Sequence, residues 1–160
     1  MKFSITGTRN KLAVENNLPF IASMLEKHIM EIKPIEMYFG GALGIDMAAL
    51  LICKEIKKHH NLQTQLITVL PNTLGVLTDN HVYELLGNSD VIIPLNREIK
   101  KEDQWDAYHK RNDYLIDKAD LLIGFPLDGE DHSGTMSTIR KAKELEKYVA
   151  VYSIKESKDD

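Results

Sequence analysis

The order of apolar segments along the chain constrains its fold more than any other feature. Short runs of β-branched and apolar residues alternate with longer stretches in which apolar residues recur every three or four positions. The first pattern is typical of buried strands and the second of amphipathic helices. Because parallel strands need crossover connections, this alternation indicates a mostly parallel sheet with helices on both faces. The sequence therefore predicts an α/β fold: a Rossmann-like three-layer α/β/α domain with about six strands.

The same patterns place the individual elements. Strands are expected at 2–6, 35–39, 66–70, 91–95, 121–125 and 149–153. Helices are expected at 18–33, 45–60, 81–86, 104–119 and 135–147, with residues 7–17 as a long loop. With 160 residues, of which 43% are hydrophobic, the chain can bury the core of one domain. We expect this domain to span 1–154, followed by a flexible tail at 155–160.

Composition excludes several classes of protein. A formal net charge of -4 argues against non-specific nucleic-acid binding, which needs an excess of Lys and Arg facing phosphates. The single cysteine, Cys53, lies in an apolar run and has no partner for a disulfide within the chain, which favours a reducing, cytoplasmic location. No segment approaches the roughly 20 apolar residues of a membrane span, so no membrane partner is expected.

Three loops that follow predicted strands carry residues suited to an anionic ligand. In a parallel sheet such loops meet at one edge, where ligands commonly bind. Glycines allow close backbone approach, arginine grips phosphate with paired donors, and helix N-termini attract anions. Two residues of the helix predicted at 104–119 add to these loops. The expected ligand-binding residues are Gly7, Thr8, Arg9, Gly40, Gly41, Gly44, Asp46, Arg111, Asn112, Ser133, Gly134 and Thr135.

Other interpretations of these residues remain open. The loop Gly40–Asp46 matches neither the G-x-G-x-x-G fingerprint nor a P-loop, and its glycines are also explained by a turn of the chain. Asp46 can cap a helix or contact a ribose or a base. Arg111 can pair with Asp113 or Asp117 on the surface, and Trp105 and Tyr108 are expected to pack in the core more readily than to stack on a base.

The acidic loop before Ser133 does not predict a metal site or a serine hydrolase. Its residues Asp128, Glu130, Asp131 and His132 are expected to face solvent, because no cysteine ligands or H-E-x-x-H pattern complete a metal site. Ser133 is not in a G-x-S-x-G elbow. We expect no metal and no required cofactor.

Taken together, the motifs resemble the SLOG superfamily, which includes the DprA, YpsA and LOG proteins. The matching segments are Ile5–Arg9 (ITGTR), Gly40–Ala49 (GGALGIDMAA), Arg111-Asn112 with Asp120, and Ser133–Thr135 (SGT). The resemblance implies a Rossmann-like domain whose strand-end loops hold nucleotides, nucleotide-derived signals or, in DprA, single-stranded DNA. It also implies a homo-oligomer.

The resemblance leaves three hypotheses for function. The first is a binding module for a nucleotide or a nucleotide-derived ligand. The second is N-glycosidic hydrolysis or transfer on nucleotides, as in LOG enzymes, with Asp46, Asp128 or Glu130 as the carboxylate. Thr138 stands where the LOG loop PGGxGTxxE has its catalytic Glu, and a threonine cannot act as that carboxylate, so binding is favoured over turnover. The third is DprA-like binding of single-stranded DNA, which the net charge disfavours.

Overall fold

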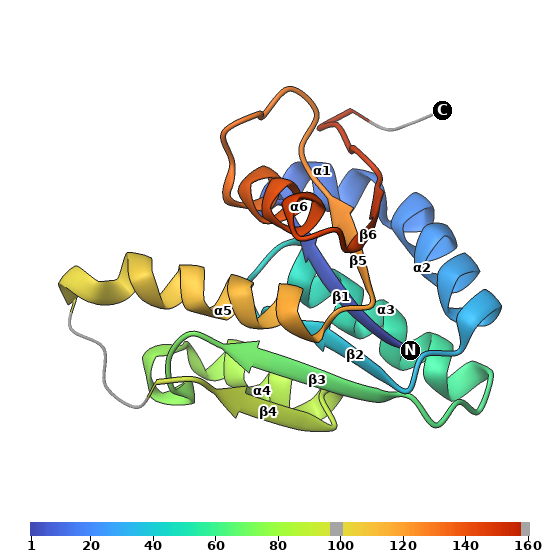
Figure 1. Cartoon of the computed structure of the whole chain (residues 1–160). Coiled ribbons are helices and arrows are strands. Elements are labelled where there is room, and N and C mark those ends of the chain that lie inside the picture. Colours follow the sequence, from blue (N-terminus) through green and yellow to red (C-terminus); the bar gives the residue numbers. More distant parts are fainter. Residues whose placement is uncertain (97–100, 158–160) are drawn as a thin grey trace.

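Six parallel strands form the centre of the computed structural model, which describes residues 1–96 and 101–157 (Figure 1). The strand order is β4-β3-β2-β1-β5-β6, and every neighbouring pair runs parallel. The strands are β1 Lys2–Gly7, β2 Glu36–Phe39, β3 Gln65–Leu70, β4 Val91–Pro94, β5 Leu121–Phe125 and β6 Tyr148–Val151. The predicted α/β fold with a six-stranded sheet is thus confirmed.

Helices cover both faces of the sheet. Buried side chains of the first four helices form one apolar core with the sheet, whereas those of the last two pack on its other face. The helices are α1 Lys11–Asn16, α2 Leu18–Ile32, α3 Ile45–His59, α4 Asp79–Asn88, α5 Gln104–Lys118 and α6 Gly134–Glu144, with short 3-10 turns at Leu74–Val76 and Lys101–Asp103. None of the helices in the described part of the chain is both long and apolar enough to cross a bilayer.

The central strand β1 has one apolar and one polar face. Phe3 and Ile5 are completely buried against the first four helices. The alternate residues Ser4 and Thr6 point to the other face, since successive side chains of a strand alternate. Ser4 Oγ donates a hydrogen bond of 2.6 Å to the Leu115 carbonyl in α5. This bond holds α5 close to β1. Thr6, two residues after Ser4 on the same face, lies near the carboxyl end of the strand.

The expected loop at 7–17 is wrong in its second half, where α1 forms. Asn10 caps this helix, because its side chain accepts a 2.9 Å hydrogen bond from the Ala13 N–H. Asn17 precedes α2 but makes no capping bond with its side chain. Its amide instead donates to the carbonyls of Ala13 and Lys155, both at 2.7 Å. The start of the predicted tail therefore lies against α1, and residues 158–160 lie outside the described residues.

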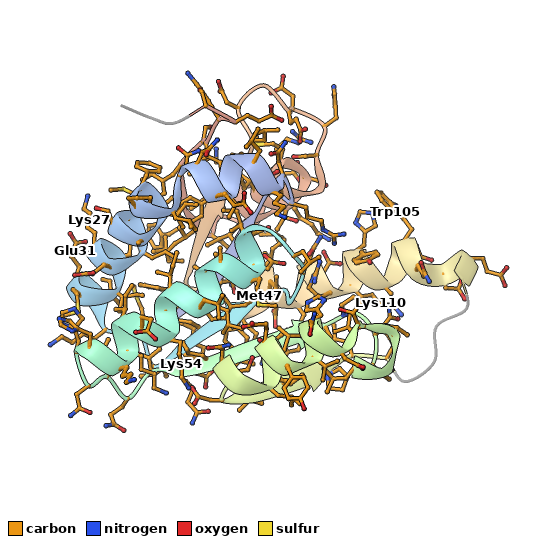
Figure 2. All side chains as sticks on the ribbon, turned by 180° about the vertical axis from the view of Figure 1, so that it is seen from behind. Lys27, Glu31, Met47, Lys54, Trp105 and Lys110 are labelled. Atoms are coloured by element: carbon orange, nitrogen blue, oxygen red, sulfur yellow. The ribbon has the colours of Figure 1, made fainter. Side chains whose placement is uncertain are left out.

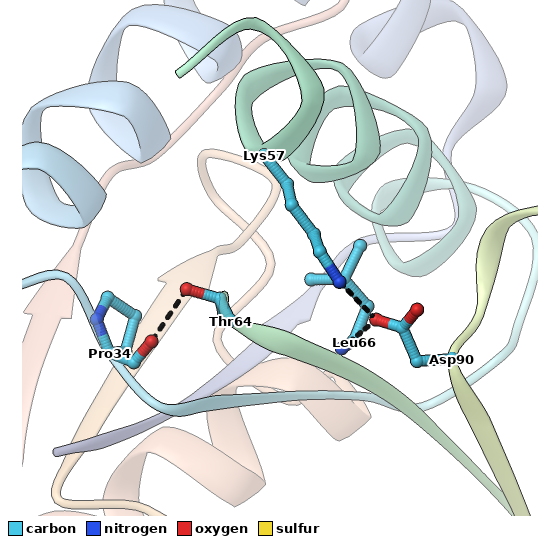
Figure 3. Close-up of polar contacts among 5 residues, drawn as sticks. All are labelled: Pro34, Lys57, Thr64, Leu66 and Asp90. Carbon is cyan, nitrogen blue, oxygen red and sulfur yellow. Dashed lines mark hydrogen bonds and ion pairs between the residues drawn. The ribbon is translucent and has the colours of Figure 1, made fainter. Parts of the chain in front are cut away.

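A partly exposed polar cluster joins α3 to the amino-terminal ends of β3 and β4, at the end of the sheet opposite to the strand-end loops (Figure 3). Asp90 Oδ2 accepts hydrogen bonds from Lys57 Nζ and from the Leu66 N–H, each 2.8 Å long. Burial disfavours the charged form of Asp90, but the two hydrogen bonds and the positive charges of Lys57 and Lys54 together outweigh burial and hold its pKa below the ordinary value of 3.8. Nearby, Thr64 Oγ1 donates to the Pro34 carbonyl at 2.6 Å.

We expect Asp90→Ala to lower the free energy of unfolding by about 1–2 kcal/mol near neutral pH, after allowing for solvent screening. Because the folded-state pKa of Asp90 is lowered, its contribution is present above the unfolded pKa of about 4 and is lost as pH falls through the folded pKa. Urea denaturation across this range measures the effect. Asp113→Ala, which removes a half-exposed ion pair with Lys141, is the control. An equal loss in both variants would contradict a special role for Asp90.

Candidate functional site

The strand order reverses between β1 and β5. The strands β2, β3 and β4 lie in that order on one side of β1, whereas β5 and β6 lie on its other side. In open parallel sheets, ligands bind in the crevice outside the carboxyl ends of the strands at such a reversal. The loops that follow β1 and β5 begin at this reversal, and Figure 1 shows that the first turns of α5 extend beyond the ends of the strands.

A cavity of about 600 Å³ occupies the crevice. We call it the switch-point cavity. It lies between the end of β1, the first turn of α3, the amino-terminal half of α5 and the start of α6. Its volume falls within the range of about 300–1,000 Å³ that is usual for small-molecule sites.

The start of α6 supplies hydrogen-bond donors to this cavity. Ser133 caps the helix, since its Oγ accepts a 3.2 Å hydrogen bond from the Met136 N–H. Within residues 1–96 and 101–157, the N–H groups of Gly134 and Thr135 have no hydrogen-bond partner, nor has the Thr135 hydroxyl. Thr135 is only 7% exposed and lines the cavity. An unpartnered hydroxyl on a largely buried residue that lines the cavity, beside two unpaired N–H groups at a helix N-terminus, favours an anionic ligand.

Arg9 adds a positive charge to the same cavity. Its guanidinium lies 5.2 Å from the centroid of the Tyr108 ring, and Arg111 lies 5.7 Å from that centroid. Arg9 is exposed and forms no ion pair among the described residues. Its charge is therefore available to a phosphate group.

Asp46 and Arg111 carry opposite charges and both lie beside Gly40, but among the described residues they do not form an ion pair within 4.0 Å. They are 8% and 5% exposed. Burial raises the pKa of the Asp46 carboxyl, and Arg111, the Ala42 N–H and Arg9 oppose that rise. Burial likewise lowers the pKa of Arg111, against the attraction of Asp46. Arg111 Nη1 donates to the Gly40 carbonyl, so the surface pairing expected with Asp113 or Asp117 is wrong.

Arg111 also orients Asn112. Its Nε donates a 2.8 Å hydrogen bond to Asn112 Oδ1. This bond occupies the oxygen of the Asn112 side chain. The NH₂ group of the same side chain has no partner among the described residues, and Asn112 lines the switch-point cavity. The arrangement presents an amide donor to a ligand.

The glycine-rich loop between β2 and α3 has mainly a structural role at this site. Gly44 has φ +89°, and a Cβ there would lie 2.6 Å from the Thr8 carbonyl oxygen and from Arg9 Cα. The first N–H group of α3, on Ile45, already donates to the Thr8 carbonyl at 3.0 Å. The N-terminus of α3 is therefore occupied by the β1 loop, and Gly44 permits that close contact.

Gly40 and Gly41 line a second cavity of about 540 Å³, at the ends of β2 and β3. His81 of α4 closes one side, because its Nε2 forms a 2.7 Å hydrogen bond with the Gly41 carbonyl. Arg9, Tyr108 and Arg111 border both cavities. We call this second space the glycine-loop cavity.

The structure thus separates the predicted ligand-binding residues into groups. Gly44 borders neither cavity, and Gly40 and Gly41 border only the second. The residues at the switch-point cavity are Gly7, Thr8, Arg9, Asp46, Arg111, Asn112, Ser133, Gly134 and Thr135.

The three candidate carboxylates also separate. Asp46 and Glu130 line the switch-point cavity, but Asp128 lies 4.0 Å from Lys155 in an exposed ion pair outside it. Thr138 is 4% exposed, donates to the Gly134 carbonyl within α6 and does not line this cavity.

Sequence reasoning favoured core packing over base stacking for Trp105 and Tyr108, and it did not name His109. Trp105, predicted to pack in the core, is 70% exposed and lines the cavity together with Tyr108 and His109. The prediction that Trp105 packs in the core is therefore wrong. The signal that could have identified these residues is their helical spacing from Asn112, which places all four on one face of α5.

The described residues contain no group of three or more His, Cys, Asp or Glu side chains placed to hold a metal ion. No protein-family model matches the chain, and no curated protein matches it.

Proposed function

We propose that this protein binds a nucleotide or a nucleotide-derived phosphate ligand in the switch-point cavity. One observation carries the proposal: Arg9, Gly134 and Thr135 all line one cavity at the reversal of strand order, and the N–H groups of Gly134 and Thr135 and the Thr135 hydroxyl have no partner among the described residues. A helix N-terminus and an arginine together suit a phosphate group. The resemblance of the sequence to the SLOG superfamily supports the same class of ligand.

Isothermal titration calorimetry with AMP, ADP, ADP-ribose and inorganic phosphate tests this function. We expect at least one of the nucleotides to bind in the micromolar range or tighter. If none binds more tightly than about millimolar, the proposal is wrong. The same samples, analysed for released base, test the hydrolase hypothesis, in which Asp46 or Glu130 supplies the carboxylate. A mobility shift with single-stranded oligonucleotides tests the third hypothesis.

Gly134→Leu should block the site without unfolding the protein. A Cβ at Gly134 meets no atom within 4 Å, so the added side chain has room beside the unpaired N–H groups. We expect the variant to bind the tightest nucleotide at least about tenfold more weakly, because leucine occupies space that a phosphate needs. The matched control is Gly87→Leu in α4, where a Cβ also meets no atom within 4 Å. Equal affinity in the two variants would place the ligand elsewhere.

A further inference from the structure

The amino-terminal half of α5 presents a row of side chains to the switch-point cavity. Trp105, Tyr108, His109 and Asn112 all line that cavity, and their spacing places them on one face of the helix. Apolar side chains with this spacing ordinarily pack into a core. Here the row forms a wall of the candidate site.

Tyr108 and Trp105 differ in what already covers their rings. The guanidinium groups of Arg9 and Arg111 lie near the Tyr108 ring, which is half-buried. Trp105 is 70% exposed, and its one aromatic neighbour among the described residues is His109, in an edge-to-face arrangement with centroids 4.9 Å apart. Figure 2 shows the Trp105 side chain standing out from the ribbon of α5. The indole therefore has a ring face available for stacking.

We propose that Trp105, supported by His109, stacks on the base of the bound nucleotide. This inference rests on the proposed function, because it assigns a second part of the same ligand. The phosphate donors of Arg9 and α6 form other walls of the cavity that Trp105 lines, so one cavity holds both a polar and an aromatic subsite. Stacking needs only the π-face that every base carries, and it is worth about 1–3 kcal/mol per base. Asn112, two turns further along the same helix face, offers its NH₂ to the ligand.

The chain provides a direct probe of this contact, since Trp105 is its single tryptophan. Fluorescence titration is carried out with the tighter-binding of AMP and ADP-ribose, and in parallel with ribose 5-phosphate, which lacks a base. We expect the nucleotide to quench the tryptophan emission and ribose 5-phosphate to leave it nearly unchanged. Calorimetry on the same samples measures binding independently of fluorescence.

Substitutions separate stacking from a structural role. Trp105→Ala should weaken nucleotide binding roughly fivefold to a hundredfold and leave ribose 5-phosphate binding unchanged. Trp105→Phe, which keeps an aromatic ring, should restore most of the affinity. The matched control is Tyr83→Ala, because Tyr83 is a 78% exposed aromatic residue on α4 that borders neither cavity.

Two outcomes would overturn the inference in distinguishable ways. If the nucleotide binds Trp105→Ala as tightly as the unmodified protein, and does not change the tryptophan emission of the unmodified protein, stacking on Trp105 is wrong while the proposed function stands. If calorimetry detects no nucleotide binding to the unmodified protein, the proposed function fails and the base subsite fails with it.

Discussion

Replacing Arg9 with glutamine is expected to weaken the binding of AMP or ADP-ribose about tenfold to a hundredfold. Arg9 follows the central strand, lines the switch-point cavity and forms no ion pair within the described parts of the chain. A phosphate in the cavity would therefore lose a charge-assisted hydrogen bond, which is among the stronger polar contacts in proteins. Calorimetry at about 0.05 M and 0.5 M salt measures the change. The affinity of the unmodified protein should fall more with salt than that of the variant, because the removed charge is exposed and screened.

Two further variants determine what Arg9 contributes. Arg9→Lys keeps the charge but loses the planar pair of donors, so we expect an affinity between those of the unmodified protein and Arg9→Gln. Lys11→Gln is the control for net charge, since Lys11 lies two residues away, pairs with Glu15 in α1 and borders neither cavity. Equal affinities for Lys11→Gln and Arg9→Gln would show that general electrostatic attraction, and not a local contact, favours the ligand.

The layered fold was predictable because the relevant signals are local and repeated. Periodic apolar residues predicted α2, α3, α5 and all six strands within a few residues. The short helix α1 was missed, because six residues give little periodicity and its start depends on one capping side chain, Asn10. The sheet order follows from contacts between segments distant in sequence, so the sequence predicted parallel pairing but not which strands are neighbours.

The candidate site was less predictable, since one sequence pattern can place a side chain in two environments. The spacing of Trp105 with Leu115 and Ile116 fits a core helix, and the last two are indeed buried. Trp105, however, is the second residue of α5, and its side chain stands out from the helix into solvent (Figure 2). Gly44 presents the same ambiguity. A glycine is needed at position 44 because φ is positive there and because the Thr8 carbonyl approaches closely, and neither feature is visible in the sequence.

Arg111→Met is expected to lower the free energy of unfolding by about 3–5 kcal/mol near neutral pH. The variant keeps the length of the side chain but leaves the buried Asp46 without the nearby positive charge that most opposes the effect of its burial, and it removes the bonds to the Gly40 carbonyl and to Asn112. Urea denaturation followed by circular dichroism measures the loss. Arg140→Met, which removes an exposed arginine whose Nη1 donates to the Asp131 carbonyl, should cost less than about 1 kcal/mol.

The pH dependence of this loss identifies its cause. Burial raises the pKa of Asp46, so the folded state retains this proton to higher pH than the unfolded chain. The stability that Asp46 contributes is therefore fully present below the unfolded pKa of about 4 and falls as pH rises through the folded pKa. Removing Arg111 raises that pKa further, because Arg111 is the strongest influence that opposes burial. The loss caused by Arg111→Met should thus be smaller at about pH 5 than at about pH 8.

The double variant Arg111→Met with Asp46→Asn separates charge from packing. It removes both buried charges, so it should recover part of the stability that Arg111→Met loses and should show little dependence on pH over the same range. It also keeps the test informative if Arg111→Met alone does not fold. A double variant as unstable as the single one, with a loss that is equal at both pH values, would mean that Arg111 stabilises the protein through its bonds to Gly40 and Asn112 rather than by neutralising Asp46.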